Sequence, residues 1–513
     1  MFARPYGPHL CRTDADSVLF EIAENQPELL AQHYAEAGLV EKSITHARVP
    51  IPTRPQSYYD ACESEDPDMG ATRKYAVIDP ATGKVDRDIF SDHVIYEDEM
   101  RKIFGRAWLM IGHESLVPAN DDYFHTYMGE DPVILTRDGQ GRLHALLNMC
   151  RHRGNRVVRC DDGTAKRFMC AYHGWTYRND GTLEHVPGKS EAYYDALDFA
   201  SLGLVEARVE TYAGLIFATW ANDAPSLDSY LGDARWYLDT VFNRRDGGMQ
   251  ALGPTKWLEP ANWKTMVDNC SDNYHVPTSH LSSASVQARF LGRPRLSHDD
   301  QFASPNKHVF VNGHAITFRD ADDDLPRYMH GVSTETMKLF EDYHRATMEE
   351  VERRLGTVRA RRVQLGNHSI FPNGILGFRL ALPRGPLKTE FWHFLLLDRD
   401  APEELKRVIR IGSQANNGAA GMFEQDDVDN WRQVTEASTS RIARRHPQDM
   451  SMGVGHAGPH PDYPGLVSER YISENNQRLF YMRWEQFMNA ESWADIPLDP
   501  IRARFDGTAT MQG

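Results

Sequence analysis

The segments CRHRG at residues 150–154 and CAYHGWTY at residues 170–177 decide the fold of this 513-residue chain. The first contains Cys150 and His152, and the second contains Cys170 and His173. Each segment therefore offers one thiolate and one imidazole, and 17 residues lie between His152 and Cys170. Two sulfur and two nitrogen ligands in two short segments predict a metal centre.

Two kinds of centre use this ligand set. A Rieske [2Fe–2S] cluster holds one iron with two Cys and the other with two His, whereas a structural zinc site binds all four ligands to one ion. Zinc fingers usually pair Cys with Cys and His with His along the sequence. Here each segment pairs a Cys with a His, as two clamps across a dinuclear cluster need. The sequence therefore predicts a Rieske cluster, with zinc as the alternative.

A second metal site is indicated by the segment DNCSDNYHVPTSH at residues 268–280. Asp272 precedes His275 by three residues, so both would lie on one face of a helix. Pro277 lacks an N–H and disfavours helical backbone at the residue before it, which would let His280 turn back toward the same metal. Two His and one carboxylate form the facial triad of non-haem Fe(II) oxygenases.

The flanks of both motifs resemble one family. CRHRG and CAYHGWTY look like its two cluster-binding loops, and residues 85–500, including Asn262-Trp-Lys264, are similar to the large (α) subunit of the Rieske non-haem iron aromatic ring-hydroxylating oxygenases. The resemblance implies a [2Fe–2S] cluster, a mononuclear Fe(II), and dihydroxylation of an aromatic ring by O₂ to a cis-dihydrodiol. It also implies that electrons from NAD(P)H arrive through a separate ferredoxin, reductase or both.

The third iron ligand is implied by a late acidic motif, GMFEQDDVDNW at residues 421–431. In the family, the second of two adjacent Asp is the ligand, which corresponds to Asp427. The spacing itself does not separate Asp427 from Asp426, so Asp426 stays the alternative. The alternative is that these residues have no ligand role and form the solvated, acidic start of a helix, because Asp is favoured at helix N-termini.

Asp272 has an implied catalytic role. In the family, the matching Asp bridges a His ligand of the Rieske cluster and a His ligand of the iron across a subunit boundary. For this chain the bridge would connect His173 of one subunit with Asp272 and His275 of its neighbour. The resemblance therefore implies a homotrimer of α subunits, with or without a small β subunit. The structural alternative is an ordinary acid three residues before a His on a helix.

The predicted fold class is α+β, with three parts. Residues 1–84 are an N-terminal extension and linker. Residues 105–225 show short strands and turns, including the hairpin signal Asn179-Asp180-Gly181, and predict a small antiparallel β Rieske domain. Residues 226–513, with 85–104 packing on them, predict a catalytic domain in which helices cover an antiparallel sheet. A helical pattern over 335–355 and strand-like runs at 363–371, 377–382 and 390–397 support this expectation.

Composition excludes several classes of protein. The chain has 73 acidic and 57 basic residues and a formal charge of −16, which argues against nucleic-acid binding. There is no apolar run near the ~18 residues of a membrane span, and scattered cysteines favour reduced thiols and a cytoplasmic location. Since no G-x-G-x-x-G dinucleotide motif follows a predicted strand, electrons must come from another protein.

Other functions remain open at the level of sequence. The same metal scaffold would serve a monooxygenase or demethylase acting on an aromatic substrate, and a non-enzymatic Rieske electron carrier is a third reading. The D-x-x-H-x-x-x-x-H motif argues against the carrier.

Val276 and Phe423 match family positions that line the substrate pocket, with core packing as the alternative. The arginines at 353–362 suggest either a solvated helix end or a docking patch for an acidic electron donor.

Overall fold

The computed structural model describes residues 74–290, 306–321, 334–375, 378–468, 470 and 472–499. The chain divides into two units after Arg73, so the expected extension over residues 1–84 lies almost entirely outside the described residues. Residues 74–84 contain two short strands. Strand β1 (Ile78–Asp79) pairs with β2 (Lys84–Val85), which pairs with β20 (Gln448–Asp449). The Tyr75 and Val77 N–H groups donate to Asn489 and Glu485 of the C-terminal helix, which fixes this segment to the larger unit.

A seven-stranded antiparallel sheet and a three-stranded sheet form the part of the chain that carries the Cys–His segments. The order in the larger sheet is β3-β12-β11-β6-β5-β4-β7, and in the smaller sheet β10-β9-β8. The strands of the larger sheet are β3 (Leu109–His113), β4 (Asp122–Met128), β5 (Asp131–Arg137), β6 (Leu143–Leu147), β7 (Asp162–Thr164), β11 (Glu206–Tyr212) and β12 (Leu215–Thr219). Those of the smaller sheet are β8 (Arg167–Met169), β9 (Thr176–Arg178) and β10 (Leu183–His185). Residues 179–181 form the turn between β9 and β10, where Gly181 has a φ of 87°.

A nine-stranded antiparallel sheet organises the rest, in the order β13-β19-β18-β17-β16-β15-β14-β22-β21. Its strands are β13 (Met249–Glu259), β14 (Asn306–Val311), β15 (His314–Asp320), β16 (Val363–Ile370), β17 (Gly374–Ile375), β18 (Arg379–Pro383), β19 (Thr389–Asp398), β21 (Ala457–Pro459) and β22 (Leu466–Ser468). Strands β16 to β19 form the predicted meander, because each pairs with the next. The α+β class with antiparallel sheets is confirmed.

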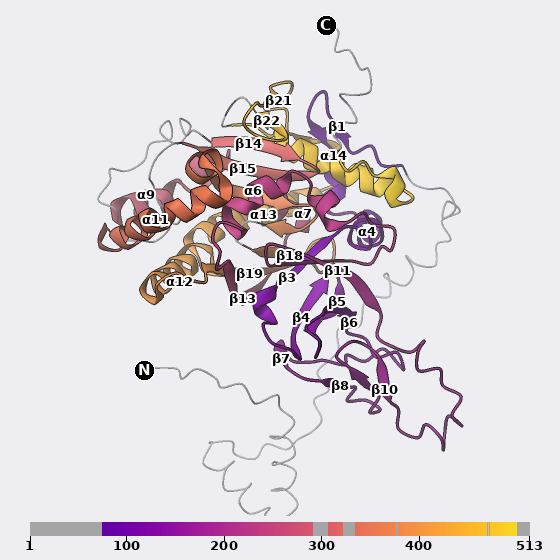
Figure 1. The fold of residues 1–513 in the computed structure, drawn as a ribbon. Helices are drawn as coiled ribbons and strands as arrows, with labels where there is room; N and C mark the ends of the chain where they lie inside the picture. Colours follow the sequence, from indigo (N-terminus) through magenta and orange to yellow (C-terminus); the bar gives the residue numbers. More distant parts are fainter. Residues whose placement is uncertain are drawn as a thin grey trace, which may run out of the picture. The chain divides into compact units, whose positions relative to one another are not determined.

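Helices lie over this large sheet (Figure 1). The helices of the described residues are α4 (His93–Glu99), α5 (Leu227–Leu231), α6 (Ala234–Phe242), α7 (Trp263–Asn269), α8 (Val276–Ser279), α9 (Leu281–Phe290), α11 (Thr334–Leu355), α12 (Glu403–Asn417), α13 (Met422–Thr439) and α14 (Asn475–Asn489). Of these, α6, α7, α12 and α14 contact strands of the nine-stranded sheet. Short 3₁₀ or π turns are η1 (Arg87–Phe90), η2 (Met100–Phe104), η3 (Glu114–Leu116), η4 (Val358–Arg362), η5 (Ala443–Arg445) and η6 (Trp493–Asp495). Within the described residues, no helix combines the length and the hydropathy that crossing a bilayer requires.

The start of α7 is set by its N-cap. The Asn262 side chain accepts the Lys264 N–H, which satisfies one of the free donors of the first turn. Its amide group donates to the Pro386 carbonyl, and its backbone N–H donates to Thr435 of α13. One residue thereby joins the helix that precedes the predicted iron ligands to the helix that carries Asp427.

The arginine run at 353–362 is paired within the chain. Arg353 and Arg354 both contact Asp246, and Arg359 contacts Asp239 at 3.1 Å. Arg361 pairs with Glu352, and Arg362 pairs with Asp320 at 3.0 Å. These ion pairs favour the structural reading of the run over the docking patch.

Three cysteines of the described residues, Cys150, Cys170 and Cys270, are free and buried, and the first two lie in the Cys–His segments.

Candidate metal centres

The two Cys–His segments form loops with the same backbone hydrogen bonds. The Gly154 N–H donates to the Cys150 carbonyl, and the Gly174 N–H donates to the Cys170 carbonyl, each at 2.9 Å. The Cys150 and Cys170 N–H groups donate to the carbonyls of Asn155 and Trp175, each at 2.8 Å. Both glycines have positive φ, 78° and 72°, a backbone region that Gly adopts without a steric penalty.

Hydrogen-bond donors surround both sulfur atoms. The Tyr177 hydroxyl lies 3.3 Å from Cys150 Sγ, and the Asn155 amide donates to Cys170 Sγ at 3.6 Å. Burial acts to raise the pKa of Cys170, but backbone N–H groups of Tyr172 and His173 and the Asn155 amide together lower it. Such donors stabilise a thiolate at Cys170, the form that binds a metal, whereas burial raises the pKa of Cys150 against the Tyr177 hydroxyl and the His152 N–H.

The two imidazoles lie together at the ends of these loops. The ring centroids of His152 and His173 are 4.5 Å apart, and the His152 ring stacks on Trp175 with an interplanar angle of 5°. His152 Nδ1 is buried and has no hydrogen-bond partner among the described residues. Burial, together with the nearby His173 and Arg153, lowers the pKa of His152 and keeps the ring neutral.

These residues fit a Rieske cluster. Two free thiols with N–H donors and two neighbouring imidazoles, one with a buried nitrogen that no described residue satisfies, are the donor set such a cluster needs. The ligand assignment of Cys150, His152, Cys170 and His173 stays a prediction.

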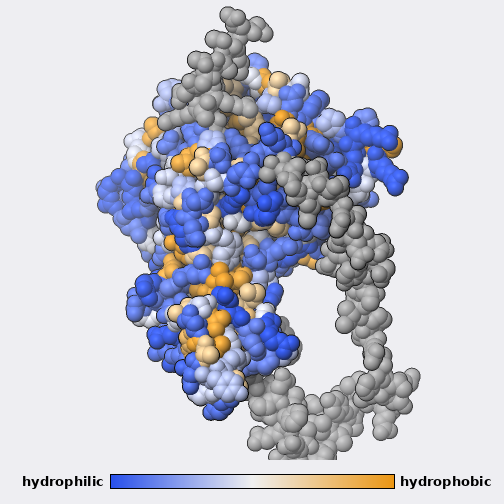
Figure 2. All heavy atoms as spheres, turned by 90° about the vertical axis from the view of Figure 1, so that its right-hand side faces the viewer, coloured by the Kyte–Doolittle hydropathy of each residue, from blue (hydrophilic) through white to orange (hydrophobic). Residues whose placement is uncertain are grey.

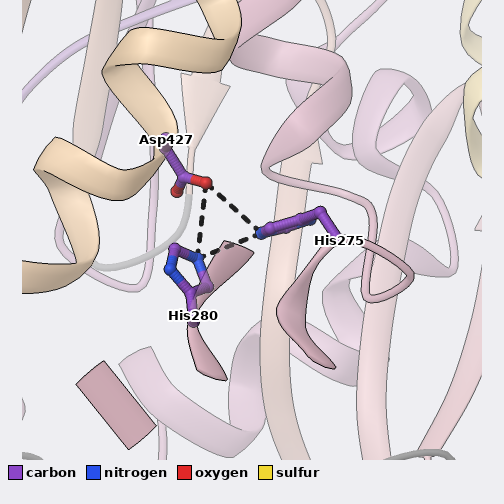
Figure 3. Close-up of side chains that lie close together, drawn as sticks. All are labelled: His275, His280 and Asp427. Atoms are coloured by element: carbon purple, nitrogen blue, oxygen red, sulfur yellow. Dashed lines mark hydrogen bonds and ion pairs between the residues drawn. The ribbon is translucent and has the colours of Figure 1, made fainter. Parts of the chain in front are cut away.

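Three further candidate ligands converge from separate elements. His275 is the N-cap residue of α8, His280 follows the end of α8, and Asp427 lies on α13. Pro277 falls in the first turn of α8, the position where a proline costs a helix least. Val276 before it is helical, contrary to the expectation from sequence, and α8 ends after one turn with His280 as its C-cap, so that the two imidazoles face each other (Figure 3).

The ligand atoms of this site are close to one another. His275 Nε2 and His280 Nε2 are 3.2 Å apart, and Asp427 Oδ1 lies 3.5 Å from the first and 3.3 Å from the second. Metal bonds of ~2.1 Å at right angles place ligand atoms about 3 Å apart. Asp427 Oδ1 is buried and accepts no hydrogen bond from the described residues. The three side chains therefore fit one metal ion.

The second ring nitrogens of both His have carboxylate partners. His275 Nδ1 contacts Asp272 Oδ2 at 3.1 Å, and His280 Nδ1 contacts Asp426 Oδ2 at 3.2 Å. Although burial acts to raise it, hydrogen bonds from His275 and the Tyr274 N–H lower the pKa of Asp272, so this side chain is a carboxylate. Such partners fix the orientation of ligand imidazoles.

The adjacent residues Asp426 and Asp427 face different atoms. Asp427 faces both Nε2 atoms, whereas Asp426 contacts only His280 Nδ1 and accepts the Ser283 hydroxyl at 2.6 Å. The geometry thus favours Asp427 over Asp426 as the third ligand, an assignment that stays a proposal. Sequence reasoning missed the role of Asp426 and Ser283, since only the folded chain brings α9 beside α13.

Behind Asp427 lies a buried ion pair that the sequence did not indicate. Glu424, one helical turn before Asp427, lies 3.2 Å from Arg379 of β18. Burial raises the pKa of Glu424 to about 7, against the opposing effect of Arg379. Phe423 packs its ring edge-to-face on His280, with centroids 4.8 Å apart. Val276 is half-buried in the first turn of α8.

Two family models match the chain. The Rieske [2Fe–2S] domain matches residues 107–212, and the ring-hydroxylating alpha subunit (catalytic domain) matches residues 227–490.

Named relatives agree with these matches. The chain is 39% identical to the biphenyl 2,3-dioxygenase subunit alpha of Rhodococcus jostii, over 82% of this chain and 92% of that protein. It is 36% identical to a benzene 1,2-dioxygenase subunit alpha of Pseudomonas putida, over 81% and 94%. Among solved structures, the naphthalene 1,2-dioxygenase from Rhodococcus sp. bound to indole is 34% identical, with a TM-score of 0.70 over 80% of this chain and 95% of that one.

Proposed function

The chain belongs to the ring-hydroxylating alpha subunits that carry a Rieske [2Fe–2S] domain, and we propose that it dihydroxylates an aromatic ring with O₂ to a cis-dihydrodiol. It is the oxygenase component of such a system and depends on a ferredoxin or reductase for electrons. The observation that carries the proposal is the presence of two donor sets in one chain. One set, of two thiols and two imidazoles, would hold a dinuclear cluster, and the other, of two imidazoles and one carboxylate, would hold an Fe(II) ion at which O₂ could be activated.

The residues around the second site have separate tasks. When bound, the cluster supplies stored electrons and the ferrous ion supplies a place where O₂ is activated. Asp272 and Asp426 orient the two imidazoles by accepting their Nδ1–H groups. Phe423 presents an aromatic ring edge against His280, which suits a flat apolar substrate.

We propose that the substrate is an unsubstituted or lightly substituted one- or two-ring arene. The named relatives act on biphenyl, benzene and naphthalene. Product analysis tests the reaction: the reconstituted protein, a surrogate ferredoxin and reductase, NAD(P)H and ¹⁸O₂ are incubated with these three arenes. We expect a cis-diol with two labelled oxygen atoms. A single labelled oxygen would support the monooxygenase alternative.

We propose a homotrimer of α subunits, in which His173 of one subunit reaches Asp272 of the next. Within the described residues, His173 makes no hydrogen bond or ion pair with Asp272, and Asp272 is 18% exposed. Figure 2 shows hydrophobic patches on the lower part of the molecule, and Met169, Tyr172 and Tyr194 of the Rieske-matching segment are among the exposed large hydrophobic residues. Exposed apolar groups at this end suit a subunit interface.

The partner and the location follow from the electron supply. The proposal requires NAD(P)H through a ferredoxin, a reductase or both, which favours a cytoplasmic location. An iron assay distinguishes this function from a simple electron carrier: the oxygenase binds three irons per chain, and a carrier binds two. Two irons per chain in fully reconstituted protein would contradict the proposal.

A further inference from the structure

The first turn of α13, the helix that carries Asp427, cannot be capped by its own N-cap residue. Gly421 occupies that position and has no side chain that could accept the free N–H groups of the turn. A Cβ atom here would lie 2.4 Å from the carbonyl group of Asn416, so none of the usual capping residues fits. Helix ends without caps fray. Since Asp427 lies just beyond this turn, the turn needs another anchor.

Glu424, in the first turn of α13, provides that anchor. Its Oε2 atom lies 3.2 Å from the guanidinium of Arg379 on β18, and its side chain is 1% exposed. The Arg379 side chain is 12% exposed, and its guanidinium lies 6.0 Å from the centre of the Phe391 ring on β19. The contact therefore joins the start of the helix to two paired strands of the large sheet.

A second contact with the sheet follows Asp427. Trp431, one turn after Asp427, is buried, and its ring packs on the Phe391 ring with centroids 5.9 Å apart. Residues three or four apart lie on the same side of a helix, so Glu424, Asp427 and Trp431 share one side of α13. Asp427 thus lies between two points at which the helix is attached to the sheet, one polar and one aromatic.

The polar attachment differs from the aromatic one in having a direction. Nonpolar contacts are non-directional, whereas the contact between a guanidinium and a carboxyl group has a preferred geometry. Direction matters here because Asp427 Oδ1 lies 3.5 and 3.3 Å from the two imidazole nitrogens that share the site. Ligand groups must be held to within about 0.5 Å for a metal site to form. A small rotation of the first turn would therefore separate Asp427 from the other ligands.

Resting on the function proposed above, we propose that Glu424, held by Arg379, is a positioning residue for Asp427. The pair fixes the first turn of α13 against β18 and so keeps Asp427 Oδ1 directed at the nitrogens of His275 and His280. It acts through direction and not through charge, since a carboxyl oxygen accepts a guanidinium N–H with or without a proton of its own.

Iron binding tests the proposal. The reconstituted protein is freed of mononuclear iron with a chelator, and Fe(II) is added back without oxygen at pH 8, with the Rieske spectrum as the check that each sample is folded. Glu424→Met and Arg379→Met should each lower the affinity for Fe(II) by about 10- to 100-fold, because the first turn loses its anchor. Their melting temperatures should also fall, since each variant leaves one buried charge unpaired.

The double variant Arg379→Met/Glu424→Met separates positioning from packing. Replacement of a buried ion pair by nonpolar residues is often neutral for stability, so its melting temperature should return close to that of wild type. The affinity for Fe(II) should remain about 10- to 100-fold lower, because the nonpolar contact does not fix the direction of the turn. Recovery of both the melting temperature and the affinity would overturn the proposal, as would single variants that bind Fe(II) like wild type.

The two single variants also distinguish positioning from a direct effect of charge. Charge alone would make Glu424→Met bind Fe(II) more weakly and Arg379→Met bind it more tightly, because each variant leaves the opposite charge near the ion. Positioning lowers the affinity in both. Shifts of opposite sign would therefore contradict the proposal.

Glu350→Met is the matched control. It breaks another Arg–Glu ion pair, in which Glu350 of α11 lies 2.6 Å from Arg245 and the two side chains are 23% and 12% exposed. Its affinity for Fe(II) should equal that of wild type. An equal loss in this control would reveal a general effect of broken ion pairs and would overturn the proposal. Failure of the proposed function is a different result: wild type itself would bind no third iron per chain or form no cis-diol.

Discussion

At the residue scale, two neighbouring carboxylates have different roles because a helix points them in different directions. Successive residues of an α-helix are turned by about 100°. Asp427 therefore faces His275 and His280 together, while Asp426 faces the outer nitrogen of His280 and the Ser283 hydroxyl.

This difference predicts unequal effects on iron binding. Asp427→Ala removes a proposed ligand and should abolish stoichiometric binding of the mononuclear iron. Asp426→Ala removes an orienting partner and should weaken iron affinity by about 10- to 100-fold. Metal titration of the two variants checks this, with the Rieske signal as an internal control that both fold. Equal iron affinities in the two variants would contradict the assignment.

Asp272 permits a second prediction at this scale. Asp272→Asn retains a side chain of the same size but loses the charge that His275 Nδ1 contacts. We expect both metal centres to remain bound, and product formation to fall by about 100-fold. Iron analysis, the Rieske spectrum and product yield are measured on the same sample. Full activity of this variant would exclude the bridging role.

At the scale of elements, a buried ion pair joins three parts of the chain. Glu99 accepts from Lys264, Trp263 and Trp484, at 2.6, 2.9 and 2.7 Å, so α4, α7 and α14 meet at one carboxylate. Both charged side chains are fully buried. Loss of one partner leaves a charge without compensation in a nonpolar core.

Lys264→Met should therefore lower the free energy of unfolding by about 3–5 kcal/mol. Lys84→Met is the matched control, because Lys84 pairs with Asp449 on the surface, where both side chains are about half exposed. The control should leave the unfolding transition unchanged. Thermal and denaturant unfolding of both variants tests the contrast, and similar stability would argue against a structural role for the buried pair.

At the scale of the whole molecule, the proposed bridge makes activity a property of the trimer. The two halves of the bridge, His173 and Asp272, belong to different subunits in this proposal. A subunit that lacks one half can still contribute the other half to its neighbour.

Mixing of two inactive variants tests this directly. His173→Ala and Asp272→Asn are expressed together in equal amounts, so that mixed trimers form. About a quarter of the interfaces then combine an intact His173 with an intact Asp272, and about a quarter of wild-type activity should return. Separate expression of each variant is the control. An absence of recovery in verified mixed trimers would contradict electron transfer between subunits.

The sequence by itself determined the local chemistry of this protein. The Cys–His pairs, the interrupted D-x-x-H-x-x-x-x-H motif and the alternation of short strands depend on neighbours in the chain, and local spacing and backbone preferences fix them. The Rieske domain and the family followed from the resemblance of residues 150–177 and 268–280 to known motifs, and the fold class followed from the strand-like and helical runs along the rest of the chain.

Only the tertiary structure decided which distant groups meet. It placed Asp427 rather than Asp426 against both imidazoles, Ser283 beside Asp426, and Tyr481 against Asp268, 213 residues away in sequence. It also paired the arginines of 353–362 with acids, which no charge count indicates. Such contacts depend on how helices pack on a sheet. The sequence around one of the two contacting residues therefore does not indicate which distant residue it will meet.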